Sequence, residues 1–366
     1  MAKLLALYLP QYHEFKENNE WWGRGYTEWT AVKRANPLFK EHVQPKVPLN
    51  NNYYDLSDPE GSTLKWQADL ARQNGIYGFC IYNYWFQGKQ LMEKPMEILL
   101  AHREIDINYC ICWANETWTR TWYGLEKEIL IEQTYGTKED WIKHYEYLNR
   151  FFEDSRYIKI NNKPVLCIYH SFDIEKLDKM LEVWNDMAIK NGYSGIYIIS
   201  GNTNAYKLET RDNLIDAYYN FEPGYTLKHK MNKMETLAYD IKVASKQTKN
   251  RFSEKKIVER TLDTEKTYIQ QIRKIENTEK KIYPGIFPQW DNTPRRNYKG
   301  LVYKHSSPEL FEKYLTNLVK RVEKNDFIFI NAWNEWGEGA YLEPDTANGY
   351  AYLKAVKKAS KYGCDK

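Results

Sequence analysis

Two glutamates near the end of the chain, Glu335 and Glu338, lie three residues apart in the run FIFINAWNEWGEG, residues 327–339. Pairs of carboxyl groups break glycosidic bonds, because one donates a proton to the leaving oxygen while the other acts as base or nucleophile. Their pKa values must differ, and the neighbouring Trp333 and Trp336 would raise the pKa of one carboxyl by excluding water. In a helical turn, residues i and i+3 come together, and the intervening glycine favours a turn. The run therefore predicts an acid–base pair.

A third glutamate, Glu116, competes for the acid role. It stands in the run WANET, directly after another apolar segment. If the two segments end on the same face of the fold, Glu116 and Glu335 could also act as a pair. The residues alone do not choose between Glu116 and Glu338. The further carboxylates Glu222 and Asp291 are expected to bind hydroxyl groups or to hold the structure.

Aromatic and amide side chains follow nearly every apolar run of the chain. Aromatic residues make up 16% of the sequence, with 31 Tyr and 13 Trp. Sugars have apolar C–H faces and polar rims, which suit flat rings with a polar group. Any single ring could equally pack in a core, but their recurrence after the apolar runs favours a carbohydrate cleft. The residues expected to bind substrate are Tyr8, Gln11, Tyr12, Tyr84, Trp85, Trp113, Asn115, Tyr169, His170, Asn202, Glu222, Trp290, Asp291, Trp333 and Asn334.

Eight short apolar runs have the composition of strands buried on both faces of a parallel sheet. Amphipathic helical segments separate most of them, which predicts an α/β fold, a (β/α)8 barrel. The alternative α/β fold is a doubly wound open sheet, in which a glycine-rich phosphate loop follows the first strand. In this sequence LPQYH stands there instead. In a barrel the carboxyl ends of all strands meet at one face, where active sites lie. The predicted strands are residues 4–9, 76–82, 108–112, 165–168, 196–200, 217–221, 283–287 and 327–330, and the predicted helices are residues 62–74, 95–103, 139–152, 174–191, 309–323 and 350–361.

Residues 224–281 differ from the rest of the chain. They hold 15 Lys or Arg against 8 Asp or Glu, a net charge of +7, whereas the whole chain carries +4. We expect a basic, mainly helical insertion between the sixth and seventh strands of a single catalytic domain, residues 1–366. It is either a solvated helical excursion or a docking surface for an acidic ligand: an acidic glycan, a lipid phosphate or a protein partner.

Composition excludes several other classes of protein. The small net charge argues against nucleic acid as a partner. Four of the five cysteines, Cys80, Cys110, Cys112 and Cys167, lie in apolar runs, and with Cys364 they show no zinc-ligand spacing. No apolar run is long enough to span a membrane, and no secretion signal is evident. We expect a cytoplasmic protein that needs no metal or other cofactor.

The long motifs resemble those of the WbsX-type family, which is associated with bacterial surface-polysaccharide loci such as those for lipopolysaccharide O-antigen. They are LALYLPQYH, EWWGRGYTEWTAVKRANPLF, GFCIYNYWFQGK, CWANETWTRTWYG, FPQWDNTPRR and NAWNEWGEGAYLEPD. That family is similar to glycoside hydrolase family 99, the endo-α-1,2-mannosidases and mannanases, which are (β/α)8 barrels.

The resemblance also implies roles for the two glutamates. Glu335 would be the base acting on the substrate 2-hydroxyl and Glu338 the general acid/base, with retention of configuration through a 1,2-anhydro sugar. A manno-configured substrate is a further implication. The sequence departs from the hydrolases at Gly337, where they carry His.

Three functions follow for testing. The first is an enzyme that cleaves or transfers glycosidic bonds of a surface polysaccharide or its precursor. The second is a nucleotide-sugar glycosyltransferase of O-antigen or capsule synthesis, against which stands the lack of an Asp-x-Asp motif or a glycine-rich pyrophosphate loop. The third is a non-catalytic glycan-binding protein, which would not need Glu335 and Glu338 together. If Glu338 points into solvent, the acid role passes to Glu116.

Overall fold

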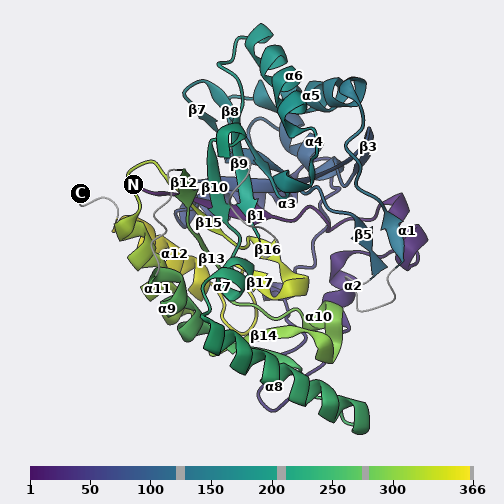
Figure 1. Ribbon diagram of the computed structural model, residues 1–366, viewed down its shortest axis with the longest axis vertical. Coiled ribbons are helices and arrows are strands. Elements are labelled where there is room, and N and C mark those ends of the chain that lie inside the picture. The colour runs from purple at the N-terminus through teal and green to yellow at the C-terminus, as the bar shows by residue number, and fades with distance from the viewer. Residues whose placement is uncertain (121–127, 204–211, 274–279, 363–366) are drawn as a thin grey trace.

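A nearly closed barrel of parallel strands forms the centre of the computed structural model, which describes residues 1–120, 128–203, 212–273 and 280–362 (Figure 1). The strands pair in the order β12-β10-β9-β8-β4-β2-β1-β15-β13, so the predicted barrel is confirmed. Their bounds are β1 Lys3–Tyr8, β2 Gly78–Phe86, β4 Asn108–Trp113, β8 Lys163–Ile168, β9 Tyr197–Asn202, β10 Ala217–Asn220, β12 Lys281–Tyr283, β13 Gly285–Ile286 and β15 Phe327–Ile330.

The seventh barrel strand, predicted as one run over residues 283–287, is broken in two. Pro284 separates β12 from β13, because proline has no N–H to donate to a neighbouring strand. The first half pairs with β10 and the second with β15. The backbone N–H of Phe329 donates to the carbonyl of Pro284 at 2.9 Å, which joins β15 to the break. The barrel therefore closes through the two halves of a single predicted strand.

The six helices predicted from the sequence cover the outside of the barrel, and each buries apolar side chains. In α11, Pro308–Arg321, the Ser307 hydroxyl caps the start by accepting from the N–H of Leu310 at 3.2 Å, and Phe311 and Leu315 lie on the buried side. The predicted helices appear as α3 Ser62–Gln73, α4 Lys94–Ala101, α5 Lys138–Phe152, α6 Leu177–Lys190, α11 Pro308–Arg321 and α12 Ala351–Lys361. In the part of the chain that is described, no helix combines the length and the apolar character needed to cross a bilayer.

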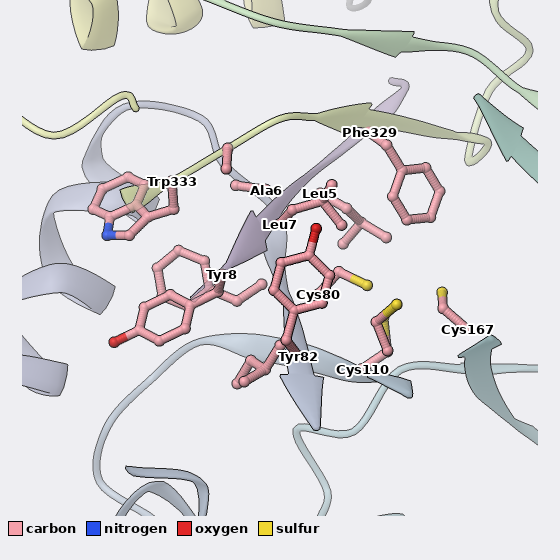
Figure 2. Close-up of a cluster of buried hydrophobic side chains, with 14 of the residues drawn as sticks. Leu5, Ala6, Leu7, Tyr8, Cys80, Tyr82, Cys110, Cys167, Phe329 and Trp333 are labelled. Atoms are coloured by element: carbon pink, nitrogen blue, oxygen red, sulfur yellow. The ribbon is translucent and has the colours of Figure 1, made fainter. Parts of the chain in front are cut away.

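Three cysteine side chains meet in the barrel interior. Figure 2 shows the sulfur atoms of Cys80, Cys110 and Cys167 turned toward one another from β2, β4 and β8. These sulfurs lie within 4.8 Å of each other, and all three residues are fully buried. Burial of Cys80, Cys110, Cys112 and Cys167 agrees with the sequence, and Cys364 lies outside the described residues. The cluster of three could not be predicted from the sequence, because it depends on which strands are neighbours and in which register. In the structure Cys80 pairs with Cys110, and Cys167 pairs with Cys112.

The described residues of the basic segment after β10 form three helices and one short strand before β12 begins. These are α7 Gly224–His229, α8 Lys233–Phe252, β11 Arg260–Asp263 and α9 Thr264–Arg273. The strand was not predicted, because its four residues pair in parallel with β14, Leu301–Lys304, which lies far along the chain. Figure 1 shows α8 along the lower edge of the molecule.

The long segment between β1 and α3 holds two short helices, α1 Lys16–Trp22 and α2 Glu28–Lys33. Thr27 begins α2 with a capping box, in which its side chain and that of Thr30 satisfy each other's backbone N–H groups. Helix α2 contacts the 3-10 turn Trp336–Glu338. The remaining elements are β3 Lys89–Leu91, β5 Trp118–Thr119, β6 Ile129–Ile131, β7 Lys159–Ile160, α10 Thr293–Arg296, β16 Asn334–Glu335 and β17 Ala340–Tyr341.

Candidate active site

The three candidate catalytic glutamates line one cavity of about 290 Å³. Glu335 ends the short strand β16, Glu338 ends the 3-10 turn that follows it, and Glu116 follows β4. All three thus follow the carboxyl ends of barrel strands, where the active sites of such folds lie. The side chain of Glu338 is only 16% exposed and faces the cavity, so it does not point away into solvent.

One arginine that lines this cavity, Arg295, contacts three carboxylates. Arg295 of α10 donates from Nε to Glu28 at 2.7 Å and from Nη2 to Glu335 at 2.9 Å, and its Nη1 lies 3.0 Å from Glu338. The arginine side chain is 7% exposed and that of Glu28 is fully buried. Glu335 and Glu338 are therefore fixed on neighbouring nitrogens of one rigid guanidinium, which sets their separation and orientation.

The electrostatics of this group favour a carboxyl pair that keeps a proton at neutral pH. Burial raises the pKa of Glu335 to about 8, although Arg295 opposes the shift, and repulsion from Glu338 adds to it. Burial likewise raises the pKa of Glu338, again against the effect of Arg295. Because ionisation of Glu338 disfavours ionisation of Glu335, the pair titrates as a unit. One protonated and one ionised carboxyl is the state that acid–base chemistry on a glycosidic bond requires.

Glu116, which lines the same cavity, has a related environment. Burial raises its pKa to about 8, with repulsion from Glu338 and Asp173 adding to the shift. The Nδ1 atom of His170 lies 3.6 Å from its carboxylate. Burial lowers the pKa of His170 to about 4, so the ring is neutral at physiological pH and does not supply a positive charge to Glu116.

Replacing Glu116 by Gln should stabilise the protein increasingly as pH rises. A carboxyl whose pKa is raised on folding binds more protons in the folded than in the unfolded state between pH about 4.5 and 8, so stability falls across that window. The amide removes this loss. Thermal melts at pH 5 and 8.5 should therefore show little difference at pH 5 and a higher Tm for the variant at pH 8.5. Glu146→Gln, at an exposed position of α5, is the control; equal behaviour of both variants would contradict the assignment.

Gly337, between the two glutamates, has no room for a side chain. A Cβ atom built there would lie 1.8 Å from the Oε1 of Glu28 and 2.8 Å from the Nε of Arg295. Glu28 and Arg295 thus occupy the volume that a side chain at position 337 would fill. The φ angle of Gly337 is not positive, so its backbone conformation does not require glycine. The close approach of Glu28 and Arg295 does.

Gly337→Ala should lower stability by about 1–3 kcal/mol through overpacking, because Glu28 is enclosed and cannot yield freely. Gly224→Ala is the matched control, because the nearest atom to its added Cβ, in Phe221, lies at an ordinary 3.8 Å. Thermal melts of both variants test the contact. A Gly337→Ala protein as stable as the control would contradict the packing described.

The structure brings only some of the expected substrate-binding residues to the cavity. Gln11, Tyr84, Tyr169 and Trp290 line it. Tyr84 and Trp85 are neighbours in β2, and successive strand residues point to opposite faces. Trp85 accordingly points outward and stacks on His144 of α5, with ring centroids 4.5 Å apart. Trp113 and Trp333 are also buried without lining the cavity.

The remaining expected residues bind other parts of the protein. The amide of Asn334 exchanges hydrogen bonds with the backbone of Leu9, at 2.8 and 3.0 Å. The Asp291 carboxylate accepts from Gln44 and Thr293 and lies 2.7 Å from His42 Nε2, away from the cavity. Six further residues are engaged in the same way and do not line the cavity: Tyr8 with Gln67, Tyr12 with the Asn334 carbonyl, Asn115 with Tyr135 and the His170 carbonyl, His170 with Thr203, Asn202 with Asn220, and Glu222 with Thr226.

Three residues of the site were not expected from the sequence: Arg295 and Arg296, which line the cavity, and Glu28, which binds Arg295 without lining it. Arg295 and Arg296 stand in the quoted run FPQWDNTPRR, where two adjacent arginines after a strand end were the available signal. Glu28 had no such signal, because it contacts Arg295 across 267 residues of sequence. Among the described residues, one group of side chains could share a metal ion, the cysteines Cys80, Cys110 and Cys167, and it does not line the cavity.

Comparison with known sequences identifies the family of the chain. A family profile described as Glycosyltransferase WbsX matches residues 4–356. Two relatives, each described as uncharacterized protein WxcX of Xanthomonas campestris pv. campestris, are 33% and 34% identical over 98% of this chain. The chain spans about half, 49%, of the length of these relatives.

Solved structures share the barrel. The GH99 endo-alpha-mannosidase from Bacteroides thetaiotaomicron covers 99% of this chain and 96% of its own length, with 13% identity and a TM-score of 0.55. A glycoside hydrolase-like protein covers 98% of this chain and 93% of its own length, with 14% identity and a TM-score of 0.58. At such identities the likeness shows a common fold. The resemblance to WbsX and to family 99 drawn from the motifs is confirmed.

Proposed function

The chain belongs to the WbsX glycosyltransferase family, and we propose that it cleaves or transfers glycosidic bonds of a bacterial surface polysaccharide or its precursor by glycosidase chemistry. The observation that carries this is the carboxyl pair Glu335 and Glu338, held by Arg295 in a cavity at the carboxyl ends of the barrel strands. A protein that only binds glycans has no need of two buried carboxyls with raised pKa values side by side. A manno-configured substrate is the first to test.

In the proposed mechanism Glu335 removes the proton of the sugar 2-hydroxyl, whose oxygen attacks C1. The C1–O bond to the leaving group breaks as Glu338 protonates that oxygen, which leaves a 1,2-anhydro sugar. Water or an acceptor hydroxyl then gives its proton to Glu338 and attacks C1, while O2 recovers its proton from Glu335. Two displacements at C1 retain the configuration. Water gives hydrolysis, and a sugar hydroxyl gives transfer.

The raised pKa of Glu338 supports the first step, since Glu338 must be protonated before it can donate. Glu335 must be ionised to act as base. Burial raises its pKa to about 8 and opposes this, whereas the neighbouring Arg295 favours the ionised form. Glu116, whose pKa is raised to about 8, faces the same cavity and is the alternative acid. Activity of the Glu338→Gln variant on substrates with a good leaving group, such as an aryl glycoside, would distinguish the two, since such groups leave without protonation.

A nucleotide-sugar glycosyltransferase is the second candidate, favoured by the description of the family. To separate the two, the protein is incubated with its host's surface polysaccharide, or the lipid-linked precursor, with and without nucleotide sugars. Product size and released sugars are followed. Cleavage without nucleotide supports the glycosidase proposal. Product growth that depends on a nucleotide sugar would overturn it in favour of the transferase.

A further inference from the structure

Two arginines other than Arg295 line the cavity beside the carboxyl pair. Arg296 ends α10, directly after Arg295, and Arg260 begins β11 in the basic insertion. Both also line an adjoining polar groove. The catalytic cavity and the insertion therefore meet at these two guanidinium groups. The groove is lined by Gln247, Asn250, Arg251, Lys256, Glu259, Arg260, Arg296, Tyr298 and Lys299.

The two guanidiniums have few partners within the protein. Arg260 donates from Nη2 to the backbone carbonyl of Lys299 at 3.2 Å. The Arg296 side chain is partly buried and makes no hydrogen bond or ion pair to another described residue, while its backbone N–H donates to the carbonyl of Asn292. Burial and the positive charge of Arg260 lower the pKa of Arg296, while Glu338 favours its charged form. A partly buried cation beside a second cation is costly unless an anion joins them.

The insertion adds cations around this pair. Arg251, Lys256 and Lys299 line the groove together with a single carboxylate, Glu259. That carboxylate is itself engaged, since it accepts from Gln247 and Asn250 at 3.3 Å each. The Lys256 ammonium donates to the backbone carbonyls of Asn250 and Ser253 and shapes the groove wall. The net field of the groove is positive and would concentrate anions at its junction with the catalytic cavity.

We propose that Arg260 and Arg296 form a binding subsite for an oxyanion carried by the saccharide substrate, a phosphate or a carboxylate group. The assignment to a saccharide rests on the proposed function, whereas binding of the anion itself does not. Guanidinium groups present pairs of N–H donors that match phosphate and carboxylate oxygens. In this proposal the basic insertion is part of the substrate site, because it supplies Arg260.

The subsite orients the substrate. Arg296 is adjacent in sequence to Arg295, whose guanidinium contacts the carboxylates of Glu335 and Glu338. An anionic group is attracted to Arg260 and Arg296 and repelled by the carboxyl pair, so a charged substrate enters with its anion toward the insertion and its scissile bond toward the glutamates. Two sources share this chemistry: the phosphate of an activated or lipid-linked sugar, and the carboxylate of an acidic sugar residue.

Calorimetric titrations at constant ionic strength test the subsite without any turnover. The probes are inorganic pyrophosphate, uridine diphosphate, glucuronate and, as the neutral reference, glucose. The proteins are the wild type, Arg260→Gln, Arg296→Gln and the control Lys249→Gln, which removes an exposed cation from α8 outside both cavities. Loss of one charged hydrogen-bonding group should weaken anion binding about 10-fold or more. The control should change it less than about 2-fold, as expected of a screened surface charge.

Each outcome decides a point. Binding of pyrophosphate or uridine diphosphate that is lost in the arginine variants supports a phosphate-bearing substrate, and the same pattern for glucuronate supports an acidic glycan. Equal binding by all four proteins, or equal weakening by Lys249→Gln, would overturn the subsite. Glu335→Gln should retain anion binding, because the subsite does not include Glu335. A wild-type protein that binds the anion yet cleaves no glycan would refute the proposed function and leave the subsite standing. Matching thermal melts exclude loss of folding as the cause.

Discussion

Glu335→Gln should reduce glycan cleavage about 10³-fold or more while the substrate still binds. The amide nearly matches the carboxylate in shape, so the cavity and its aromatic walls persist. It cannot take the proton of the 2-hydroxyl, and the loss of a positioned general base costs 10²–10⁴-fold in rate. Turnover is measured by release of reducing ends from the polysaccharide, and binding by calorimetry with the same oligosaccharide.

The matched control is Glu146→Gln, which makes the same chemical change at an exposed position of α5. It should leave turnover and binding as in the wild type. A Glu335→Gln enzyme that retains more than about a tenth of the activity would remove Glu335 from the mechanism. Loss of both binding and turnover would assign it to substrate recognition instead.

Arg295→Gln should have the largest effect on stability, about 3–5 kcal/mol. The change leaves Glu28, Glu335 and Glu338 without their common cation in a site where Arg295 is 7% exposed, and breaking a buried ion pair from one side has this cost. The exposed pair Arg150–Glu97, at 3.1 Å, offers the control. Arg150→Gln should cost no more than about 1 kcal/mol.

The destabilisation by Arg295→Gln should grow with pH. Arg295 lowers the pKa of Glu335 and of Glu338, so its removal raises both further above their unfolded values. At pH 4–5 these carboxyls are protonated in the folded protein and the missing cation matters little. Toward pH 8 and above the wild type ionises them beside Arg295, whereas the variant must bury them unpaired or keep them protonated. Urea unfolding at pH 5 and 8.5 measures the free energy of unfolding of both proteins. A destabilisation that does not depend on pH would contradict the charge pairing of Arg295 with Glu335 and Glu338.

The barrel could be predicted from sequence because its signals are local. Each strand is a short apolar run, and each is followed by polar residues that break it, as in FIFI before NAWNE. The break at Pro284 was also visible as a proline within a predicted strand, but the pairing of its two halves with β10 and β15 depends on closure of the whole barrel. The pairing of β11 with β14 joins distant segments in the same way.

The candidate site was predictable only in part, for two physical reasons. Successive residues of a strand face opposite sides, so of the neighbours Tyr84 and Trp85 only one could reach the cavity, and the aromatic pattern did not say which. Polar residues near strand ends also satisfy the loops around them, as Asn334 does with Leu9. The roles proposed for Glu335, Glu338 and Glu116 remain predictions for the variants described above.

The close approach at Gly337 makes the residue types at positions 28, 295 and 337 depend on one another. A side chain at 337, such as that of His, would collide with Glu28 and Arg295 as they stand. Substituting position 337 alone would crowd the site, and substituting Arg295 alone would leave its carboxylates without their common cation. Among WbsX sequences, glycine at 337 should therefore be inherited together with glutamate at 28 and arginine at 295, and lineages that lose one should have lost all three.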